Sequence, residues 1–253
     1  MEKTTNNATV APRGRFAPSP SGRMHLGNIY TALVSWLSVR AAGGKWILRI
    51  EDLDPFRSKP EYAQLIEEDL GRLGLDWDEG GINGKGMESP CMQSLRHHLY
   101  ADASRRLAGA GLTYGCRCRR AEILATQAPH QSDGRIVYSG KCRPCPEPPF
   151  PRKETEGTAT RLYVPDIEIG YSDRMAGYVS FNLAKECGDF VIRRADGAWA
   201  YQLAVVADDH DMGITEVVRG CLLYTSVDGL ADQRGSGASA NGGAAYHELW
   251  RSV

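Results

Sequence analysis

The sequence predicts an α/β fold, in which helices flank a parallel sheet and a small segment of different composition is inserted. Two observations predict the sheet. Residues 13–51 read as strand, helix and strand, and the second strand is apolar at nearly every position, as in a sheet buried on both faces. The insert is predicted over about 114–151, where Cys, Arg, Pro and Gly replace periodic apolar residues. We therefore expect one α/β domain over residues 13–220, interrupted by this insert.

The first strand, helix and strand follow a polar arm, residues 1–12, which we expect to be disordered. The first strand is expected over Arg13–Ala17 and is followed by a turn rich in Pro, Ser and Gly. Gly43 ends the next helix, and the buried strand runs over Lys45–Glu51. The helix is predicted from apolar residues at helical spacing, which are Leu26, Ile29, Tyr30, Leu33, Val34 and Leu37.

Later elements are predicted from caps and periodicity. Ser58, with Glu61 three residues on, is expected to be the N-cap of a second helix. A third helix is expected over Ser94–Ala108, and α/β patterning resumes at Asp189–Arg193 and Ala200–Ala207.

Composition sets broad limits on function. The chain has 253 residues, and its 30 basic and 31 acidic side chains nearly cancel, so binding to nucleic acid would depend on local basic patches. The sequence has no apolar run of membrane-spanning length, and it lacks the apolar region of a secretory signal. Both observations favour a cytoplasmic protein with no membrane partner. In that compartment, clustered members of the seven cysteines indicate a metal site before disulfides.

A candidate nucleotide site lies between the first strand and the first helix, where open α/β sheets bind ligands. The helix N-terminus offers unpaired N–H groups and a dipole that favours phosphate, and side chains on its first turn add donors. A turn with a capping histidine is the structural alternative. The candidate nucleotide-binding residues are Pro18, Gly22, His25, Gly27 and Asn28.

Residues 15–28 resemble the signature of glutamyl- and glutaminyl-type class I aminoacyl-tRNA synthetases. His25-Leu26-Gly27-Asn28 matches the family's "HIGH" motif, with Asn in place of the final His, so a hydrogen-bond donor remains but a titratable ring is lost. The resemblance implies that His25 and Asn28 are catalytic and stabilise charge on an attacked phosphate.

A candidate glutamate site follows the second strand, where three acids stand in the string Glu51-Asp52-Leu53-Asp54. A solvated acidic turn is the structural alternative. The resemblance places Glu51 at the ammonium group of glutamate and nominates Arg15 and Arg219 for its side-chain carboxylate. It also places Ala17, Ser19 and Tyr201 at this pocket, although Tyr201 could equally be a packing residue on a strand.

The cysteine-containing insert is a candidate zinc site. Chemistry alone favours four thiolates, Cys116, Cys118, Cys142 and Cys145, since thiolate is a better zinc ligand than phenol. The glutamyl-Q family of tRNA synthetases, which the insert resembles, instead implies Cys116, Cys118, Tyr138 and Cys142. Scattered buried cysteines without metal are the remaining alternative.

The resemblance covers about residues 13–220, including family-like strings at 165–168, 188–194 and 213–220. It implies a Rossmann-like class I synthetase catalytic domain with a connective, zinc-bearing insert. The implied activity is activation of L-glutamate with ATP and Mg²⁺, followed by transfer to queuosine in the anticodon loop of tRNA(Asp). We expect a monomer. The alternatives are a fragment of a glutamyl-tRNA synthetase that charges tRNA(Glu), a small-molecule nucleotidyltransferase, and a non-catalytic zinc-bearing RNA-binding module.

Residues 221–253 do not match the family and are rich in Gly and Ser, so we expect them to be foreign to the enzyme or disordered. Class I synthetases of this kind carry a second ATP motif, Lys-x-Ser-Lys, downstream of the stretch that ends here at Gly220, whereas Lys185 is the last lysine of this sequence. A mobile lysine neutralises the departing pyrophosphate. We therefore expect the chain as written to be unable to complete catalysis.

Overall fold

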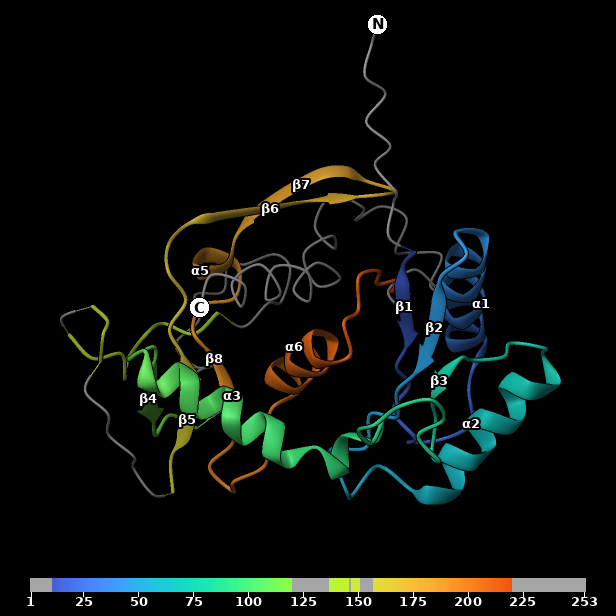
Figure 1. Ribbon diagram of the computed structural model, residues 1–253. Coiled ribbons are helices and arrows are strands. Elements are labelled where there is room, and N and C mark those ends of the chain that lie inside the picture. The colour runs from blue at the N-terminus through green and yellow to red at the C-terminus, as the bar shows by residue number, and fades with distance from the viewer. Residues whose placement is uncertain (1–10, 120–136, 146, 151–156, 220–253) are drawn as a thin grey trace, which may run out of the picture. The chain divides into compact units, whose positions relative to one another are not determined.

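The computed structural model describes residues 11–119, 137–145, 147–150 and 157–219, and these divide into two compact units (Figure 1). The first unit comprises residues 11–96 and 211–219, and the second comprises the described residues between 97 and 210. Most of the predicted arm, part of the predicted insert and the predicted tail lie outside the described residues. None of the described helices combines the length and apolar character needed to cross a membrane.

The first unit contains a parallel sheet of order β1-β2-β3, which confirms the predicted strand-helix-strand crossover. Two isolated parallel bridges add to this sheet. One pairs Gly14 of β1 with Glu216, and the other pairs Ile50, just after β2, with Met92. The elements are β1 (Arg13–Phe16), α1 (Leu26–Ala41), β2 (Lys45–Leu48), α2 (Pro60–Arg72), β3 (Glu79–Gly80) and the short 3-10 helix η1 (Gln93–Leu95).

Helix α1 packs on the sheet through small residues rather than through its large apolar ones. Its buried residues are Ala32, Ser35 and Val39. A Cβ at Gly14 of β1 would lie 2.3 Å from Cγ2 of Val39, so glycine is required for this close approach. The large apolar residues at helical spacing instead include a well-exposed set, Leu26, Tyr30, Leu33 and Leu37. The spacing therefore predicts the helix correctly but does not identify its buried face.

Two predicted helix starts are wrong. Helix α2 begins at Pro60 with Lys59 as its N-cap, because proline suits the first helical position, while the Ser58 N–H donates to the carbonyl of Asp54 in a preceding turn (2.9 Å). The helix expected from Ser94 is divided into η1 and α3 (His97–Gly109). Arg96 separates them, because its side chain is fully buried and donates to the carbonyl of Pro90 (2.7 Å).

The second unit contains two antiparallel sheets, of order β4-β5-β8 and β6-β7. Tyr201 is the first residue of α6 and is 46% exposed, so the alternative of a packing residue on a strand is wrong. The elements are α3, β4 (Thr113–Cys116), β5 (Ala159–Leu162), β6 (Glu168–Asp173), β7 (Gly177–Asn182), α5 (Leu183–Glu186), β8 (Phe190–Arg193) and α6 (Tyr201–Asp211), whose last residue belongs to the first unit.

Candidate functional site

The loop between β1 and α1 is hydrogen-bonded to the segment that follows β2. The Arg49 N–H donates to the carbonyl of Phe16 and the Glu51 N–H to that of Pro18, both at 3.0 Å. Further on, Lys59 donates to the carbonyl of Pro20, also at 3.0 Å. These bonds place the two motifs side by side at the carboxyl edge of the sheet, where open parallel sheets bind their ligands.

His25 is the N-cap of α1 in a reciprocal capping box. Its Nδ1 accepts hydrogen bonds from the N–H groups of Gly27 (3.1 Å) and Asn28 (3.4 Å), and Oδ1 of Asn28 accepts from the His25 N–H (3.2 Å). The two side chains take part in the cap only through acceptor atoms, Nδ1 of His25 and Oδ1 of Asn28. Because Nδ1 accepts, the proton of a neutral His25 lies on Nε2. The structural alternative and the functional interpretation therefore agree, because capping leaves the side-chain N–H groups to serve a ligand.

The approach to this helix terminus is open. His25 is exposed, and a Cβ built at Gly22 would meet no atom within 4 Å. Pro18 is buried and Gly27 is partly buried, so these two residues shape the loop from behind. The helix N-terminus could thus receive an anionic group without displacing protein atoms.

Glu51 is buried and is paired with the fully buried Arg49, whose Nη2 lies 3.0 Å from Glu51 Oε1. The guanidinium holds the carboxylate in one orientation and prevents an uncompensated charge in the interior. Sequence reasoning missed Arg49. The available signal was a charged residue within an otherwise apolar strand, two positions before the candidate carboxylate.

The two other acids of the string support the loop instead. Asp52 accepts from the backbone N–H (2.8 Å) and the hydroxyl (2.6 Å) of Ser94. Asp54 accepts from the N–H of Phe56 (3.1 Å) in a tight turn. The acidic string therefore has divided roles, with Glu51 as its one buried carboxylate.

The remaining candidate pocket residues differ in their surroundings. Arg15 is buried in β1, whereas Ala17 is partly buried and Ser19 is exposed. Arg219 is the last described residue and is exposed. The first unit thus contains Arg15, Ala17, Ser19, Glu51 and Arg219, while Tyr201 lies in the second unit.

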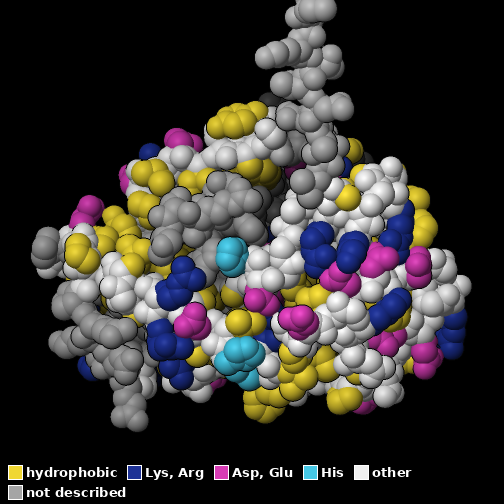
Figure 2. Space-filling view, viewed as in Figure 1, with side chains coloured by type: hydrophobic (Ala, Val, Ile, Leu, Met, Phe, Trp, Pro, Cys, Tyr) yellow, Lys and Arg dark blue, Asp and Glu magenta, His cyan; other side chains and the backbone are white. Residues whose placement is uncertain are grey.

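Charges of both signs are interspersed on the surface of the first unit, over α1, α2 and β3 (Figure 2). At its sheet edge, Glu79 is held between Arg13 and Lys45, each at 2.8 Å. The hydrogen bond from Arg13 is the main cause that lowers the pKa of Glu79, and burial opposes it only in part, so this pKa is about 2.

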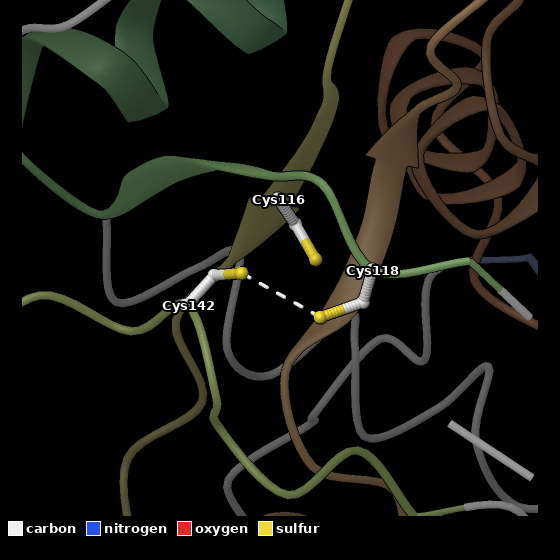
Figure 3. A group of neighbouring side chains, drawn as sticks. All are labelled: Cys116, Cys118 and Cys142. Carbon is white, nitrogen blue, oxygen red and sulfur yellow. Dashed lines mark hydrogen bonds between the residues drawn. The ribbon is translucent and has the colours of Figure 1, made fainter. Parts of the chain in front are cut away.

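A second candidate site lies in the second unit, where three thiols point toward one another (Figure 3). The Sγ atoms of Cys116, Cys118 and Cys142 all lie within 4.8 Å of one another, and those of Cys118 and Cys142 are 3.5 Å apart. Ligands about 2.3 Å from a tetrahedral zinc ion would be separated by roughly 3.8 Å. The spacing of these sulfurs is therefore compatible with a shared zinc ion.

Tyr138 completes this cluster. Its hydroxyl oxygen lies 3.5 Å from Sγ of Cys116 and 3.8 Å from Sγ of Cys118, and it accepts from the backbone N–H of Cys142 (2.8 Å). Cys145 is exposed and is not part of the group. The geometry thus brings together the ligand set implied by the resemblance and not the four thiolates favoured by chemistry alone.

The cluster already favours one thiolate. Burial by itself raises the pKa of the Cys142 thiol, but hydrogen bonds from the Arg117 backbone, the Tyr138 hydroxyl and the neighbouring thiols outweigh burial and lower this pKa to about 7. Burial, followed by the hydrogen bond with Cys116, raises the pKa of Tyr138. A cation at the centre would stabilise the ionised forms of both groups.

The comparisons with known proteins identify the family of the chain. Residues 12–227 match the family described as tRNA synthetases class I (E and Q), catalytic domain. A protein of Neisseria meningitidis named glutamyl-Q tRNA(Asp) synthetase is 47% identical over 214 residues, which are 84% of this chain and 68% of the relative. Proteins of the same name from Symbiobacterium thermophilum and Chromobacterium violaceum are 49% and 45% identical, covering 82% and 91% of this chain and 65% and 72% of each relative.

Solved structures give a more distant match. The structure of a glutamate tRNA ligase from Elizabethkingia meningosepticum in complex with its amino acid has a TM-score of 0.67 and 30% identity, and covers 82% of this chain and 43% of that one. The glutamate-tRNA synthetase of Elizabethkingia anophelis gives a TM-score of 0.68 at the same identity, over 82% and 44% of the two chains. The chain therefore spans about two thirds of the curated relatives and less than half of these structures.

Proposed function

We propose a function that follows from the family of this chain. The chain belongs to the class I tRNA synthetases (E and Q) and, among them, to the glutamyl-Q tRNA(Asp) synthetases. We infer that the enzyme activates L-glutamate with ATP and Mg²⁺ and transfers the glutamyl group to queuosine in the anticodon loop of tRNA(Asp). The observation that carries this proposal is identity of 45–49% to curated relatives of that name over at least 82% of the chain.

In this proposal, glutamate binds at the carboxyl edge of the parallel sheet. Glu51, oriented by Arg49, receives the ammonium group. Arg15 and Arg219 pair with the side-chain carboxylate, assisted by Ala17 and Ser19 of the same unit. Tyr201 stays a prediction of the family resemblance. A buried guanidinium favours glutamate over glutamine, because it forms stronger, charge-assisted hydrogen bonds with a carboxylate than with a neutral amide.

ATP binds with its phosphates at the N-terminus of α1, beside Pro18, Gly22 and Gly27. The α-carboxylate of glutamate attacks the α-phosphate, and pyrophosphate leaves with the electron pair of the broken P–O bond. His25 Nε2–H and the amide of Asn28 donate to the phosphate oxygens as negative charge develops on them. These donors need no rearrangement, because the capping box already fixes both side chains.

Zinc fits the cluster of Cys116, Cys118, Tyr138 and Cys142, where it would act as a structural ion. Three thiols and a phenol converge beside a small aromatic core made of Tyr114, Phe150 and Tyr163, so a shared metal would add cohesion to a cluster of limited size. The cluster belongs to the second unit, and the proposed nucleotide site belongs to the first.

The test has two parts. The chain itself should bind a non-hydrolysable glutamyl-adenylate analogue, measured by calorimetry, and lose that binding in Glu51→Ala. A version extended to the length of the curated relatives should exchange pyrophosphate into ATP with glutamate in the absence of tRNA, and should then glutamylate tRNA(Asp) that contains queuosine.

One observation favours a second candidate, because the structural matches are glutamate tRNA ligases. For a fragment of such an enzyme, exchange should require tRNA(Glu), and tRNA(Asp) should not be glutamylated. That result would replace the proposed function. Binding of RNA without any binding of the adenylate analogue would instead indicate a non-catalytic RNA-binding module.

A further inference from the structure

A cation lies over the ring of Tyr138. The guanidinium carbon of Arg161 is 3.6 Å from the centroid of that ring, which is well within the range of a cation–π contact. Both residues are buried, with exposures of 6% each. The contact is therefore shielded from water, and cation–π interactions are stronger in such a desolvated environment.

Arg161 is itself held by the main chain. On β5, its Nη1 donates to the carbonyl of Asp189 at 2.6 Å. The fully buried Asp189 is fixed in turn through its carboxylate, which accepts from the Tyr114 hydroxyl, from Arg143 at 2.7 and 2.8 Å, and from the Val164 N–H at 2.8 Å. The guanidinium thus has a rigid anchor that is independent of the cysteines.

The backbone of Tyr138 is also restrained. Gly188 has a φ of +64°, and a Cβ there would lie 2.9 Å from the carbonyl oxygen of Tyr138. The residue before Asp189 must therefore be small for the Tyr138 segment to approach. Gly188 thus contacts the backbone of Tyr138, while the carbonyl of Asp189 holds the arginine that stacks on its ring.

We propose that Arg161 is a positioning residue for the metal centre, which holds the Tyr138 ring so that its oxygen faces the three thiols. Its positive charge also offsets the negative charge that a set of thiolates and a phenolate carries around a metal ion. The inference rests on the proposed zinc site. The role of Arg161 explains why the site uses the phenol of Tyr138, the weakest of the candidate ligands, although the thiol of Cys145 lies close in the sequence.

The experiment measures zinc affinity of the full chain by competition with a chromophoric chelator. Arg161→Met should weaken zinc binding about 10- to 100-fold, the usual effect of removing a group that orients a metal ligand. Arg193→Met is the control, because Arg193 also stacks on an aromatic ring of the second unit, but on Trp199 (5.1 Å) and not on Tyr138. The control should leave zinc affinity unchanged.

A double-mutant cycle separates positioning from general packing. If Arg161 acts through Tyr138, then Arg161→Met should have little further effect in a Tyr138→Phe background. Cobalt in place of zinc gives a second readout, since Arg161→Met should alter the ligand-field bands while the thiolate-to-cobalt charge-transfer bands persist. If Arg161→Met does not fold, Arg161→Lys, which keeps the charge but not the planar stack, is measured in the same way.

Each outcome is decisive. A wild-type chain that binds no zinc would overturn the proposed metal centre itself. A wild-type chain that binds zinc, with affinity and cobalt spectrum unchanged in Arg161→Met or in Arg161→Lys, would overturn the positioning role alone. Fully additive losses in the double-mutant cycle would show that Arg161 acts independently of Tyr138.

Discussion

The segments that carry His25 and Glu51 are joined by main-chain hydrogen bonds at the ends of regular elements, whereas the thiols of Cys116, Cys118 and Cys142 meet one another and the Tyr138 hydroxyl through their side chains. In the first unit, a strand edge and a helix cap fix the geometry before any ligand arrives. In the second, a buried ionic network around Asp189 holds Arg161, which stacks on the Tyr138 ring. The first arrangement should tolerate loss of one side chain without loss of structure, and the second should not.

The largest expected effect is on the cysteine cluster. Cys116→Ser should abolish stoichiometric zinc binding and loosen the surroundings of the cluster, because the change removes both a proposed ligand and a buried side chain of the small core. Elemental analysis and hydrogen exchange of the second unit measure the two consequences. Binding of ATP by the first unit should persist.

Cys145→Ser is the matched control, since Cys145 is exposed and outside the cluster. It should keep the metal, while Tyr138→Phe should weaken binding. The opposite pattern, with Cys145→Ser losing zinc and Tyr138→Phe retaining it, would restore the four-thiolate site.

A large but purely local effect is expected in the first unit. Arg15→Ala should weaken glutamate binding by on the order of 2–5 kcal/mol, the range for removing one partner of a buried charge pair. Calorimetry with glutamate and, separately, with ATP measures the difference. Arg23→Ala, which removes an exposed arginine paired with Asp69, should change neither affinity. Equal losses for both ligands in Arg15→Ala would show that the glutamate pocket is misplaced.

Acid should weaken the sheet edge of the first unit. The pKa of Glu79 is about 2, compared with an ordinary value of 4.5, so its ion pairs contribute their full stability above pH 4.5 and lose it as pH falls toward 2. We expect a loss of about 2 kcal/mol over that window, allowing for screening of its exposed partners. Chemical denaturation at a series of pH values should show this slope in the wild type and a flatter one in Glu79→Gln.

The smallest expected effect is at the helix cap. Asn28→Ala removes the acceptor for the His25 N–H and should reduce stability by about 1 kcal/mol. ATP binding should weaken as well, because His25 loses its restraint. Thr31→Ala removes a hydroxyl that bonds only within the same helix, to the carbonyl of Gly27 (2.9 Å), and serves as the control for thermal unfolding and ATP titration. Unchanged ATP affinity in Asn28→Ala would remove this residue from the proposed catalytic set.

Local patterns predict the first unit well. The buried run after Gly43 gives β2, and the turn before His25, which is rich in Pro and Ser, places the helix start correctly. The buried face of α1 could not be found in this way, because contact with the sheet is made by Ala32 and Ser35, whereas spacing rules weight large apolar residues such as Leu26.

Long-range contacts explain most of what sequence reasoning missed. Arg161 and Asp189 are 28 positions apart, and Tyr114 lies 75 positions from Asp189, so no local pattern connects them. The choice of Tyr138 over Cys145 came from family resemblance, and ligand chemistry alone would have missed it. Arg49 was the exception, since a charge within an apolar strand was visible in the sequence.

The bridge between Gly14 and Glu216 affects how the chain is made on the ribosome. Strand β1 is synthesised before the other described strands and pairs with β2 on one edge. The residues on its other edge, such as Thr215, whose N–H donates to the carbonyl of Arg13 (2.9 Å), emerge about 200 residues later. The second unit is one continuous stretch from His97 to His210 among the described residues, and can fold while β1 still has an open edge. Proteolysis of ribosome-bound chains stalled with residue 210 just outside the exit tunnel should therefore cut near β1 and spare β5 and β8. A parallel strand with one open edge during synthesis is a site for mispairing with a neighbouring nascent chain, so the speed with which residues 211–219 follow sets how long that hazard lasts.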